Sequence, residues 1–547
     1  MVATIPILLR GVKTDWTNYD LNPLARNEVS LGIKFANVNG SDTFRVFTIS
    51  RWACVPFCLL GGWVCYRWAS ELWGPISGIS ALVLWSTSPI ILGHGALVMP
   101  DVPAAAMGIT ATWQFWKCAR QPTWSQAVFV GLLLGLAELC KTTLLVFIAI
   151  WPLLWYCNSS RNARTEIGVR GLRRTIMLLV ILLCALYILN LGYGFLGSFQ
   201  KLGSFHFVSR KLKGVAGGED VIGNRFRNTV LHDCPIPLPR DYLQGIDRQA
   251  ADFEIGDRSY LRGTWQERGW WYYHIYALGV KLPLGTLIMI VTAVAVTAKS
   301  SHYRHGWFDE LCLLLPVIGI IGLISSQSGF SNHMRYVIPA LPFCFIWISK
   351  IGMAFHFRDR YIAFVAILSL AWCAASSLFV FPHSLSYFNE LVGGPRNGAK
   401  HLLDSNIAWG QDLLHFREWL DRHPEIDRIQ LATIGWVDPQ FAGINVALPP
   451  VAPKYSGQNI PADLGLEVGP QPGWYAIDVN FLHGTPLPVA KGGGRWKRIP
   501  PDGPNYEYFK NLEPVDSIGY STYIYRVSTE QANLIRHELG LPQLTDK

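Results

Sequence analysis

Ten apolar runs occupy most of the first 383 residues, and each is close to the length of a helix that crosses a membrane. Such a helix needs about 17–25 apolar residues to span roughly 30 Å of hydrocarbon. The runs lie at residues 52–69, 75–98, 102–117, 126–141, 143–157, 176–198, 275–298, 310–328, 335–352 and 361–383. Only 16% of all residues are charged, whereas soluble domains carry about 25%. We therefore expect a polytopic α-helical membrane protein with about ten spans.

The positions of Lys and Arg predict the orientation of these spans, because basic residues gather in short cytoplasmic turns. One set of turns holds most of the basic residues: Arg67, Lys117, Arg120, Arg161, Arg164, Arg170, Arg173, Arg174, Lys299, Arg304, Arg358 and Arg360. The opposite short turns hold Lys141 and Arg335. The first set is therefore predicted to be cytoplasmic. The net charge of +9 lies in turns rather than on one basic face, so nucleic-acid binding is excluded.

This orientation divides the chain into five parts. We expect a first extracytoplasmic loop remnant at 1–51, membrane helices at 52–198, a large extracytoplasmic loop at 199–274, membrane helices at 275–383 and an extracytoplasmic α/β domain at 384–547. In the last part, runs at 429–434, 474–481 and 522–527 have the composition of strands. Residues 412–420 read as an amphipathic helix, and the three glycines at 492–494 read as a turn.

The eleven cysteines lie mostly inside apolar runs, where cysteine behaves as a small hydrophobic residue. The sequence contains no Cys-x-x-Cys pair and no local His/Cys cluster that would indicate a zinc site. The sequence therefore names no metal ligand.

Charged residues at the outer ends of the runs are the candidates for catalysis and substrate binding. Asp101 precedes the run at 102–117, where it could cap the helix or act on a substrate. Lys141 lies between two apolar runs, where charge is costly and is usually functional or paired. Its simplest partner would be Glu138, at helical spacing.

Further candidates lie later in the chain. Arg335 and Lys281 could bind phosphate or anchor the protein to lipid headgroups. The aromatic run at 260–273 contains Trp270 and Trp271, which fit an interfacial belt or stacking on carbohydrate. Together these side chains place an acid, cations and aromatic rings on one outer face, and that combination suits a lipid-phosphate-linked substrate.

Several of these residues lie in segments that resemble the polyprenyl-phosphate-dependent glycosyltransferases of the GT-C superfamily. The segments are GHGALVMPDVPAA (93–105), GLLLGLAELCKTTLLV (131–146), SYLRGTWQERGWWYYHIYALGVKLPLG (259–285) and NHMRYVIPALP (332–342). The branch they resemble most is that of the dolichyl-phosphate-mannose–protein mannosyltransferase-like and aminoarabinose-transferase-like proteins. A fifth segment, at 387–413, resembles one that recurs at the membrane exit of a bacterial subgroup, so the resemblance covers about residues 20–415.

The resemblance implies an inverting transfer of a sugar from a polyprenyl-phosphate donor to an extracytoplasmic hydroxyl of a protein, lipid or glycan. It implies a multi-pass protein of a bacterial-type inner membrane, and it leaves a divalent metal open as a cofactor. Asp101 matches a family acid and is the expected catalytic residue. Lys281 and Arg335 match positions that hold the lipid phosphate, and Lys141 matches a lysine whose role the family does not define. His333, Tyr336, Trp270 and Trp271 lie in the matching segments and are expected to bind substrate.

One departure from the family leaves other functions open. The element at 22–26 resembles one that follows the family's first span and its catalytic acid, so both would fall upstream of Met1. We therefore expect either a reading frame that begins too late or an inactive remnant, with Asp15 as a substitute base if the loop refolds. The alternative function is that of a catalytically degenerate relative that binds a lipid-linked sugar or acts as a scaffold. A transporter would show inverted repeats, and we find no such symmetry in the sequence.

Overall fold

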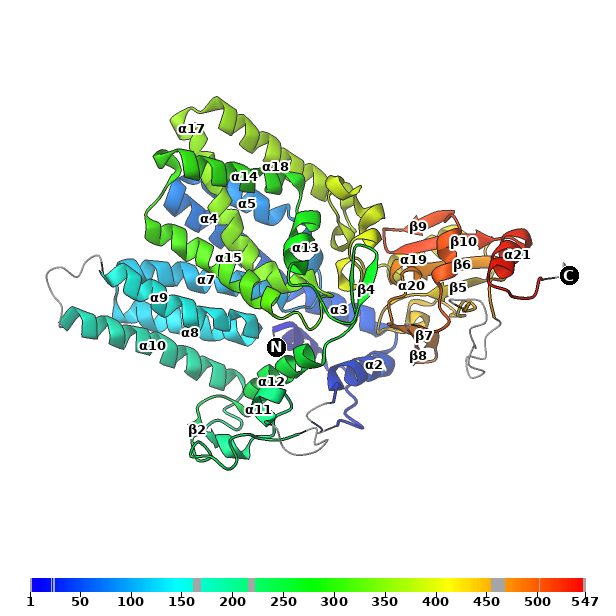
Figure 1. The fold of residues 1–547 in the computed structure, drawn as a ribbon, viewed down its shortest axis with the longest axis horizontal. Coiled ribbons are helices and arrows are strands. Elements are labelled where there is room, and N and C mark those ends of the chain that lie inside the picture. Colours follow the sequence, from blue (N-terminus) through cyan, green and yellow to red (C-terminus); the bar gives the residue numbers. More distant parts are fainter. Residues whose placement is uncertain are drawn as a thin grey trace.

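The computed structural model describes residues 2–20, 22, 25–160, 169–214, 222–453, 468–500 and 502–544. Arg161 and Arg164 of the basic turns, and Pro23 and Leu24 of the element at 22–26, lie outside the described residues. A bundle of helices forms one end of the long axis, and a sheet with three helices forms the other (Figure 1). The segment between α18 and α19 joins the two parts.

The ten apolar runs all fall on helices. These are α4 (Val55–Trp73), α5 (Pro75–Ser86), α6 (Pro89–Gly95), α7 (Asp101–Arg120), α8 (Trp124–Cys140), α9 (Val146–Ser160), α10 (Val169–Gly192), α13 (Tyr273–Lys281), α14 (Leu284–Lys299), α15 (Trp307–Ser326), α16 (Leu341–Ile348) and α18 (Arg360–Val380). The short helix α17 (Ala354–Phe357) lies between the last two runs. Short 3-10 turns extend α16 at both ends, as η5 (Met334–Ala340) and η6 (Ser349–Met353).

Two predicted spans are bent rather than straight. The run at 75–98 is divided into α5 and α6, which meet at 55°. The break lies where Ser88 caps α6, by accepting a hydrogen bond from the backbone N–H of Ile91, and where Pro89 opens that helix. The run at 275–298 is divided into α13 and α14, which meet at 113° next to Pro283. Proline has no backbone N–H with which to continue the hydrogen bonds of a preceding helix. Hydropathy does not register this loss, so it did not reveal the two bends.

Five helical stretches in the described part of the chain are long and apolar enough to cross a membrane, or up to seven if each bent pair is one span. The stretches α8 and Thr142–Asn158 are shorter apolar helices. The protein is thus helical with several candidate spans, whereas the count of ten stays a prediction.

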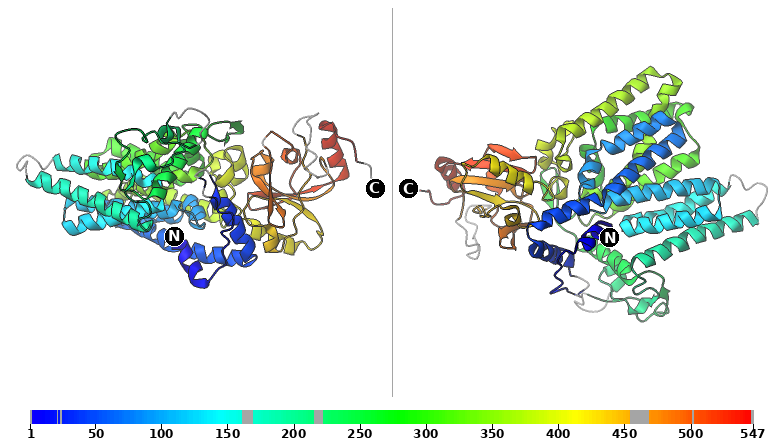
Figure 2. Two further views of the ribbon diagram at one scale, coloured as in Figure 1. Left: turned by 90° about the horizontal axis from the view of Figure 1, so that it is seen from below. Right: turned by 180° about the vertical axis from the view of Figure 1, so that it is seen from behind.

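Ion pairs tie the helices together at the end that carries the basic turns. Glu71 accepts from Lys117 at 3.0 Å, and Asp309 accepts from Arg120 at 2.5 Å. At the opposite end of the bundle lie the N-terminal helices, the 199–274 segment and the sheet (Figures 1 and 2). The two groups of segments that the charge pattern separates therefore lie at opposite ends of the bundle.

Glycines bring α8 close to α10. A Cβ at Gly131 would lie 2.5 Å from the Ile181 carbonyl oxygen, and one at Gly135 would lie 2.6 Å from that of Ala185. Small residues at this spacing let helices in membranes approach closely. This contact positions the end of α8, where Glu138 and Lys141 lie.

The end of the chain contains a four-stranded mixed sheet in the order β5–β6–β10–β9. Strand β5 (Ile429–Ala432) pairs in parallel with β6 (Gly473–Asp478), which pairs antiparallel with β10 (Thr522–Val527), and β10 pairs antiparallel with β9 (Asp516–Ile518). The strands predicted around β5, β6 and β10 are confirmed, as is the helix near 412–420, which is α19 (Leu413–Arg422). Phe416 and Trp419 of α19 pack on Leu431, Ala476 and Ile524 of the sheet.

The remaining elements of this region surround the sheet. They are α20 (Val479–Leu482), α21 (Thr529–Glu538) and the hairpin of β7 (Pro488–Gly492) and β8 (Arg495–Arg498). Gly492, Gly493 and Gly494 all have positive φ, so these three glycines form the predicted turn. The division of the chain into domains stays a prediction.

The first 51 residues and residues 199–274 fold mainly into short elements. The first segment contains α1 (Ile5–Arg10), α2 (Asn27–Asn39) and α3 (Asp42–Trp52), with α3 leading into α4. The second contains β1 (Gln200–Lys201), α11 (Arg210–Lys213), β2 (Pro235–Ile236), α12 (Arg240–Ile255), β3 (Ser259–Leu261) and β4 (Thr264–Gln266). Arg26 pairs with Asp252 of α12 at 2.6 Å, so the two segments contact each other.

Candidate active site

Asp101 and Lys141 form a buried ion pair at the outer end of the bundle. Asp101 is the first residue of α7, and Lys141 follows the last residue of α8 in an extended conformation. The Lys141 ammonium lies 2.5 Å from Asp101 Oδ1, and the two side chains are 11% and 2% exposed. The second carboxylate oxygen of Asp101 is buried and has no hydrogen-bond partner among the described residues.

This geometry corrects two simpler expectations. Asp101 does not cap α7, because the N-cap position is Pro100 and no side chain caps the helix. Lys141 pairs with Asp101 instead of Glu138, and Glu138 accepts a hydrogen bond from the Tyr242 hydroxyl at 3.1 Å. The extended backbone of Lys141 ends the helix, so its side chain leaves the face that carries Glu138.

Arg335 lies beside this pair, in the first turn of η5. Its guanidinium lies 5.7 Å from the ring centre of Tyr336 and 5.0 Å from that of Trp409, and its Nη1 lies 3.4 Å from Met99 Sδ. The Lys141 ammonium lies 4.9 Å from the same Tyr336 ring. Arg335 and Asp101 are thus within about 15 Å of each other, the length of roughly ten helical residues.

The Nε atom of Arg335 is buried and has no partner among the residues that the structure describes. An unpaired buried donor costs about 1–3 kcal/mol. A bound anion would satisfy this donor, so the cluster of Lys141, Tyr336 and Arg335 suits a phosphate group.

A polar cavity of ≈390 Å³ opens next to this cluster. Its lining includes His333, Tyr336 and Asp404, together with the Arg26–Asp252 pair. His333 Nδ1 lies 2.7 Å from the Ser405 hydroxyl and 3.6 Å from Asp404 Oδ1. The sequence-predicted residues His333 and Tyr336 thus lie together on one wall.

Asp404 is a site residue that sequence reasoning did not single out. Its φ is +60°, a left-handed conformation that costs a residue other than glycine about 1–2 kcal/mol, and its backbone N–H donates to Asn480 Oδ1 at 2.5 Å. Burial raises the pKa of Asp404 to about 6, although its side chain is still 17% exposed. The one signal in the sequence was its position in the recurrent segment 387–413.

Lys281 was expected to hold the lipid phosphate together with Arg335, and the structure gives it other partners. Its side chain is buried, and its ammonium donates to the carbonyl oxygens of Leu385 at 2.8 Å and Asn406 at 2.6 Å. The ammonium also lies 4.4 Å from the Phe388 ring centre. Lys281 thus holds the segment after α18 against α13, and these contacts use donors that a phosphate would need.

Lys281→Met should therefore lower stability rather than donor binding. It leaves two buried carbonyl groups without a donor, which we expect to lower the free energy of unfolding by about 2 kcal/mol or more. Thermal unfolding of the purified protein would measure this loss. Lys299→Met, at the exposed end of α14, is the control. A Lys281→Met variant with unchanged unfolding and weakened polyprenyl phosphate binding would contradict the structural role.

The two predicted tryptophans lie outside the cavity lining. Trp270 packs partly buried against the core, whereas the Trp271 side chain is 66% exposed beside Tyr272. Neither lines the ≈390 Å³ cavity. Trp271 has the exposure expected of an interfacial aromatic residue, and its carbohydrate contact stays a prediction.

A second cavity, of ≈560 Å³ and apolar, lies near the cluster. Its lining includes Met99, Pro100 and Cys140, which are neighbours in the chain of Asp101 and Lys141, as well as Phe57 and Leu139. Met99 also contacts Arg335. The cluster therefore contacts residues of both cavities, because Met99 lines the apolar one and Tyr336 lines the polar one, and this arrangement suits the phosphate of a lipid-linked substrate.

Known proteins show similarity to part of this chain. Residues 40–189 match the family described as dolichyl-phosphate-mannose-protein mannosyltransferase. ArnT from Cupriavidus metallidurans in the apo state has a TM-score of 0.37 and 13% sequence identity, and the same protein bound to undecaprenyl phosphate has 0.36 and 11%. Both comparisons cover 90% of this chain and 86% of that chain. No curated protein matches.

The family match includes Asp101 and Lys141, whereas Arg335, His333 and Asp404 lie beyond it. Together with the apolar helices, it indicates an integral membrane protein. The match over residues 40–189 thus confirms the resemblance to the dolichyl-phosphate-mannose-protein mannosyltransferases that the sequence motifs indicated.

Proposed function

We propose that this protein transfers a sugar from a polyprenyl-phosphate donor to an extracytoplasmic hydroxyl, with inversion at the anomeric carbon. The observation that carries the proposal is the cationic cluster next to an apolar and a polar cavity, with an unpaired buried Nε on Arg335. The polyprenyl chain would occupy the apolar cavity, and the sugar and acceptor would occupy the polar one. The family match supports the same class of donor.

In this mechanism Arg335 and Lys141 bind the donor phosphate. As the bond between the anomeric carbon and the phosphate oxygen breaks, negative charge grows on the phosphate, and preorganised cations stabilise it. Asp101 neutralises and positions Lys141 through their ion pair. We therefore assign Asp101 a positioning role, in place of the catalytic role expected from the sequence.

Asp404 is better placed than Asp101 to act as the general base. Asp101 is almost fully buried against Lys141, whereas Asp404 lines the polar cavity. Its carboxylate would take the proton of the acceptor hydroxyl as the hydroxyl oxygen attacks the anomeric carbon. Asp404 contacts His333, His333 contacts Tyr336, and Tyr336 contacts Lys141, so the base and the phosphate site are linked through two side chains. Inversion requires that the base and the leaving phosphate act on opposite faces of the sugar.

The direct test is turnover in proteoliposomes with a panel of radiolabelled polyprenyl-phosphate sugars. Release of polyprenyl phosphate together with a labelled acceptor would support the transferase. Tight binding of the donor without release, by the parent chain, would instead support a degenerate lipid-sugar binding protein. Protein, lipid and glycan acceptors are tested separately, because the cavity holds groups that recognise hydroxyls in general.

The topology that the proposal needs can be tested with a native cysteine. Cys234 in the 199–274 segment is exposed, whereas the other ten cysteines are buried or half-buried. A membrane-impermeant maleimide should label intact cells at Cys234, and Cys234→Ser should abolish that label. Arg358→Cys, placed on the Cys234→Ser background, should react only after the cells are permeabilised. Labelling at position 358 in intact cells would contradict the orientation.

A further inference from the structure

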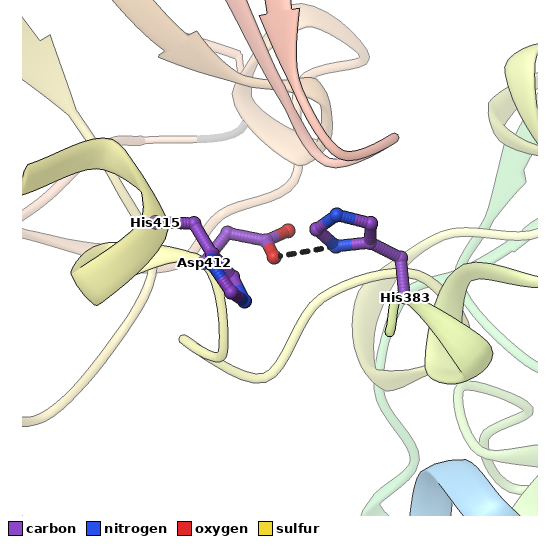
Figure 3. Close-up of side chains that lie close together, drawn as sticks. All are labelled: His383, Asp412 and His415. Atoms are coloured by element: carbon purple, nitrogen blue, oxygen red, sulfur yellow. Dashed lines mark hydrogen bonds and ion pairs between the residues drawn. The ribbon is translucent and has the colours of Figure 1, made fainter. Parts of the chain in front are cut away.

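A cluster of two histidines and an aspartate lies where the helical bundle meets the sheet (Figure 3). His383 follows α18, Asp412 immediately precedes α19, and His415 lies in the first turn of α19. One potential ligand atom from each side chain lies within 4.8 Å of the others. These residues are remote in the sequence from the cationic cluster, and no local His/Cys spacing revealed them.

The geometry points to a zinc site: we propose that His383, Asp412 and His415 bind one Zn²⁺ ion. Imidazole and carboxylate ligands suit zinc, whereas Ca²⁺ and Mg²⁺ take oxygen ligands. Zinc lies about 2.0–2.2 Å from nitrogen and oxygen ligands, so two ligand atoms on a tetrahedral ion are about 3.4 Å apart. His383 Nδ1 and Asp412 Oδ1 are 3.0 Å apart. The three side chains need small rotations to close around an ion.

Neighbouring groups orient the ligands as they do in established metal sites. The Ser521 hydroxyl donates to Asp412 Oδ2 at 2.5 Å, and Gln411 Nε2 lies 3.4 Å from the same oxygen, which leaves Oδ1 toward His383. Glu418 Oε2 lies 3.4 Å from His415 Nδ1. A carboxylate on Nδ1 selects the tautomer whose Nε2 can bind a metal.

The location indicates what the ion would do. His383 follows α18, Asp412 and His415 lie at the start of α19, and Ser521 lies in the turn between β9 and β10. Gly519 in that turn lies so close to the His383 ring that a Cβ would come within 2.5 Å of Nδ1. A zinc ion here joins the bundle to the sheet and keeps at least one coordination position for water, because the protein supplies three ligands.

Metal content tests the site without any assay of activity. The full chain, without a polyhistidine tag, is purified in detergent, stripped with a chelator, incubated with Zn²⁺ and desalted. We expect about one zinc per chain. His383→Ala and His415→Ala should each lower retained zinc to less than a tenth of that amount, and Co²⁺ in the parent should give a visible absorption band that both variants lack. His537→Ala, on the exposed face of α21, should retain zinc like the parent.

A second measurement separates metal binding from folding. The His415 side chain is 41% exposed, so its removal should leave the fold intact. Zn²⁺ should raise the Tm of the parent and of His537→Ala but not that of His415→Ala, because a ligand stabilises only the state that binds it. Ser521→Ala keeps all three ligands and should weaken zinc binding about 10–100-fold. Parent protein that retains less than a tenth of a zinc per chain, or His415→Ala that takes up as much as the parent, would overturn the site and leave a His–Asp ion pair.

Discussion

Arg335→Ala should lower the rate of glycosyl transfer by about 10²–10³-fold, the usual loss when one preorganised donor to a developing oxyanion is removed. The guanidinium contacts Met99, Tyr336 and Trp409 and has an unpaired buried Nε. Its loss removes charge and donors from the leaving phosphate. The comparison of kcat/KM between variant and parent in proteoliposomes measures the effect.

Two further variants make this result specific. Arg335→Lys keeps the charge but loses the planar fork of donors, so it should recover only part of the rate. Arg526→Ala is the matched control, because Arg526 also stacks on a tryptophan, 5.6 Å from the ring centre of Trp474, and lies in the sheet. Arg335→Ala with a rate within threefold of the parent would exclude a role for Arg335 in phosphate binding.

Asp404→Asn should lower transfer by about 10²–10⁴-fold, the range of general acid–base catalysis. The pKa of Asp404 is raised to about 6 by burial, and only the ionised carboxylate accepts a proton. The rate of the parent should therefore fall as the pH drops through about 6. The residual rate of Asp404→Asn should lack this dependence. Asp427→Asn, at an exposed site, should behave like the parent.

The raised pKa of Asp404 affects stability in the opposite direction from the rate: the rate rises with pH through about 6, whereas the contribution of Asp404 to stability falls. Measurements of rate and of unfolding therefore distinguish a loss of catalysis from a loss of folding. Because the pKa of Asp404 is higher in the folded state than its ordinary value of 3.8, its contribution to stability is complete below that value and is lost as the pH rises through about 6. Asp404→Asn should thus be as stable as the parent at pH 8, or more stable. Its oxygen can still accept the Ser405 backbone N–H. A variant that is inactive because it unfolds at pH 8 would contradict the proposed base.

Hydropathy and charge along the chain predicted the helices and several of the site residues. The apolar runs locate α4 to α10, α13 to α16 and α18, because a span of hydrocarbon must be matched by a continuous apolar stretch. Asp101, Lys141 and Arg335 stood out because charge is costly at the ends of such stretches. The alternation of apolar residues located β5, β6 and β10, because the side chains of a strand point alternately to its two faces.

Hydropathy and charge along the chain could not predict which residue each charged side chain contacts. At helical spacing, Glu138 was the simplest partner for Lys141, yet tertiary packing brings Asp101 to Lys141 and Tyr242 to Glu138. Lys281 looked equivalent to Arg335 at a span end. The segment after α18 folds back over Lys281 and supplies the carbonyl groups that bury its charge.

The sequence by itself determined a helical membrane protein with an acid, two cations and aromatic residues near one face, because composition and period are local properties. Only the tertiary structure decided which of those groups meet. It paired Asp101 with Lys141, placed Asp404 on the cavity wall and gathered His383, Asp412 and His415 from separate elements. These contacts join residues far apart in the chain, and they depend on how whole helices and strands pack, which no local pattern encodes.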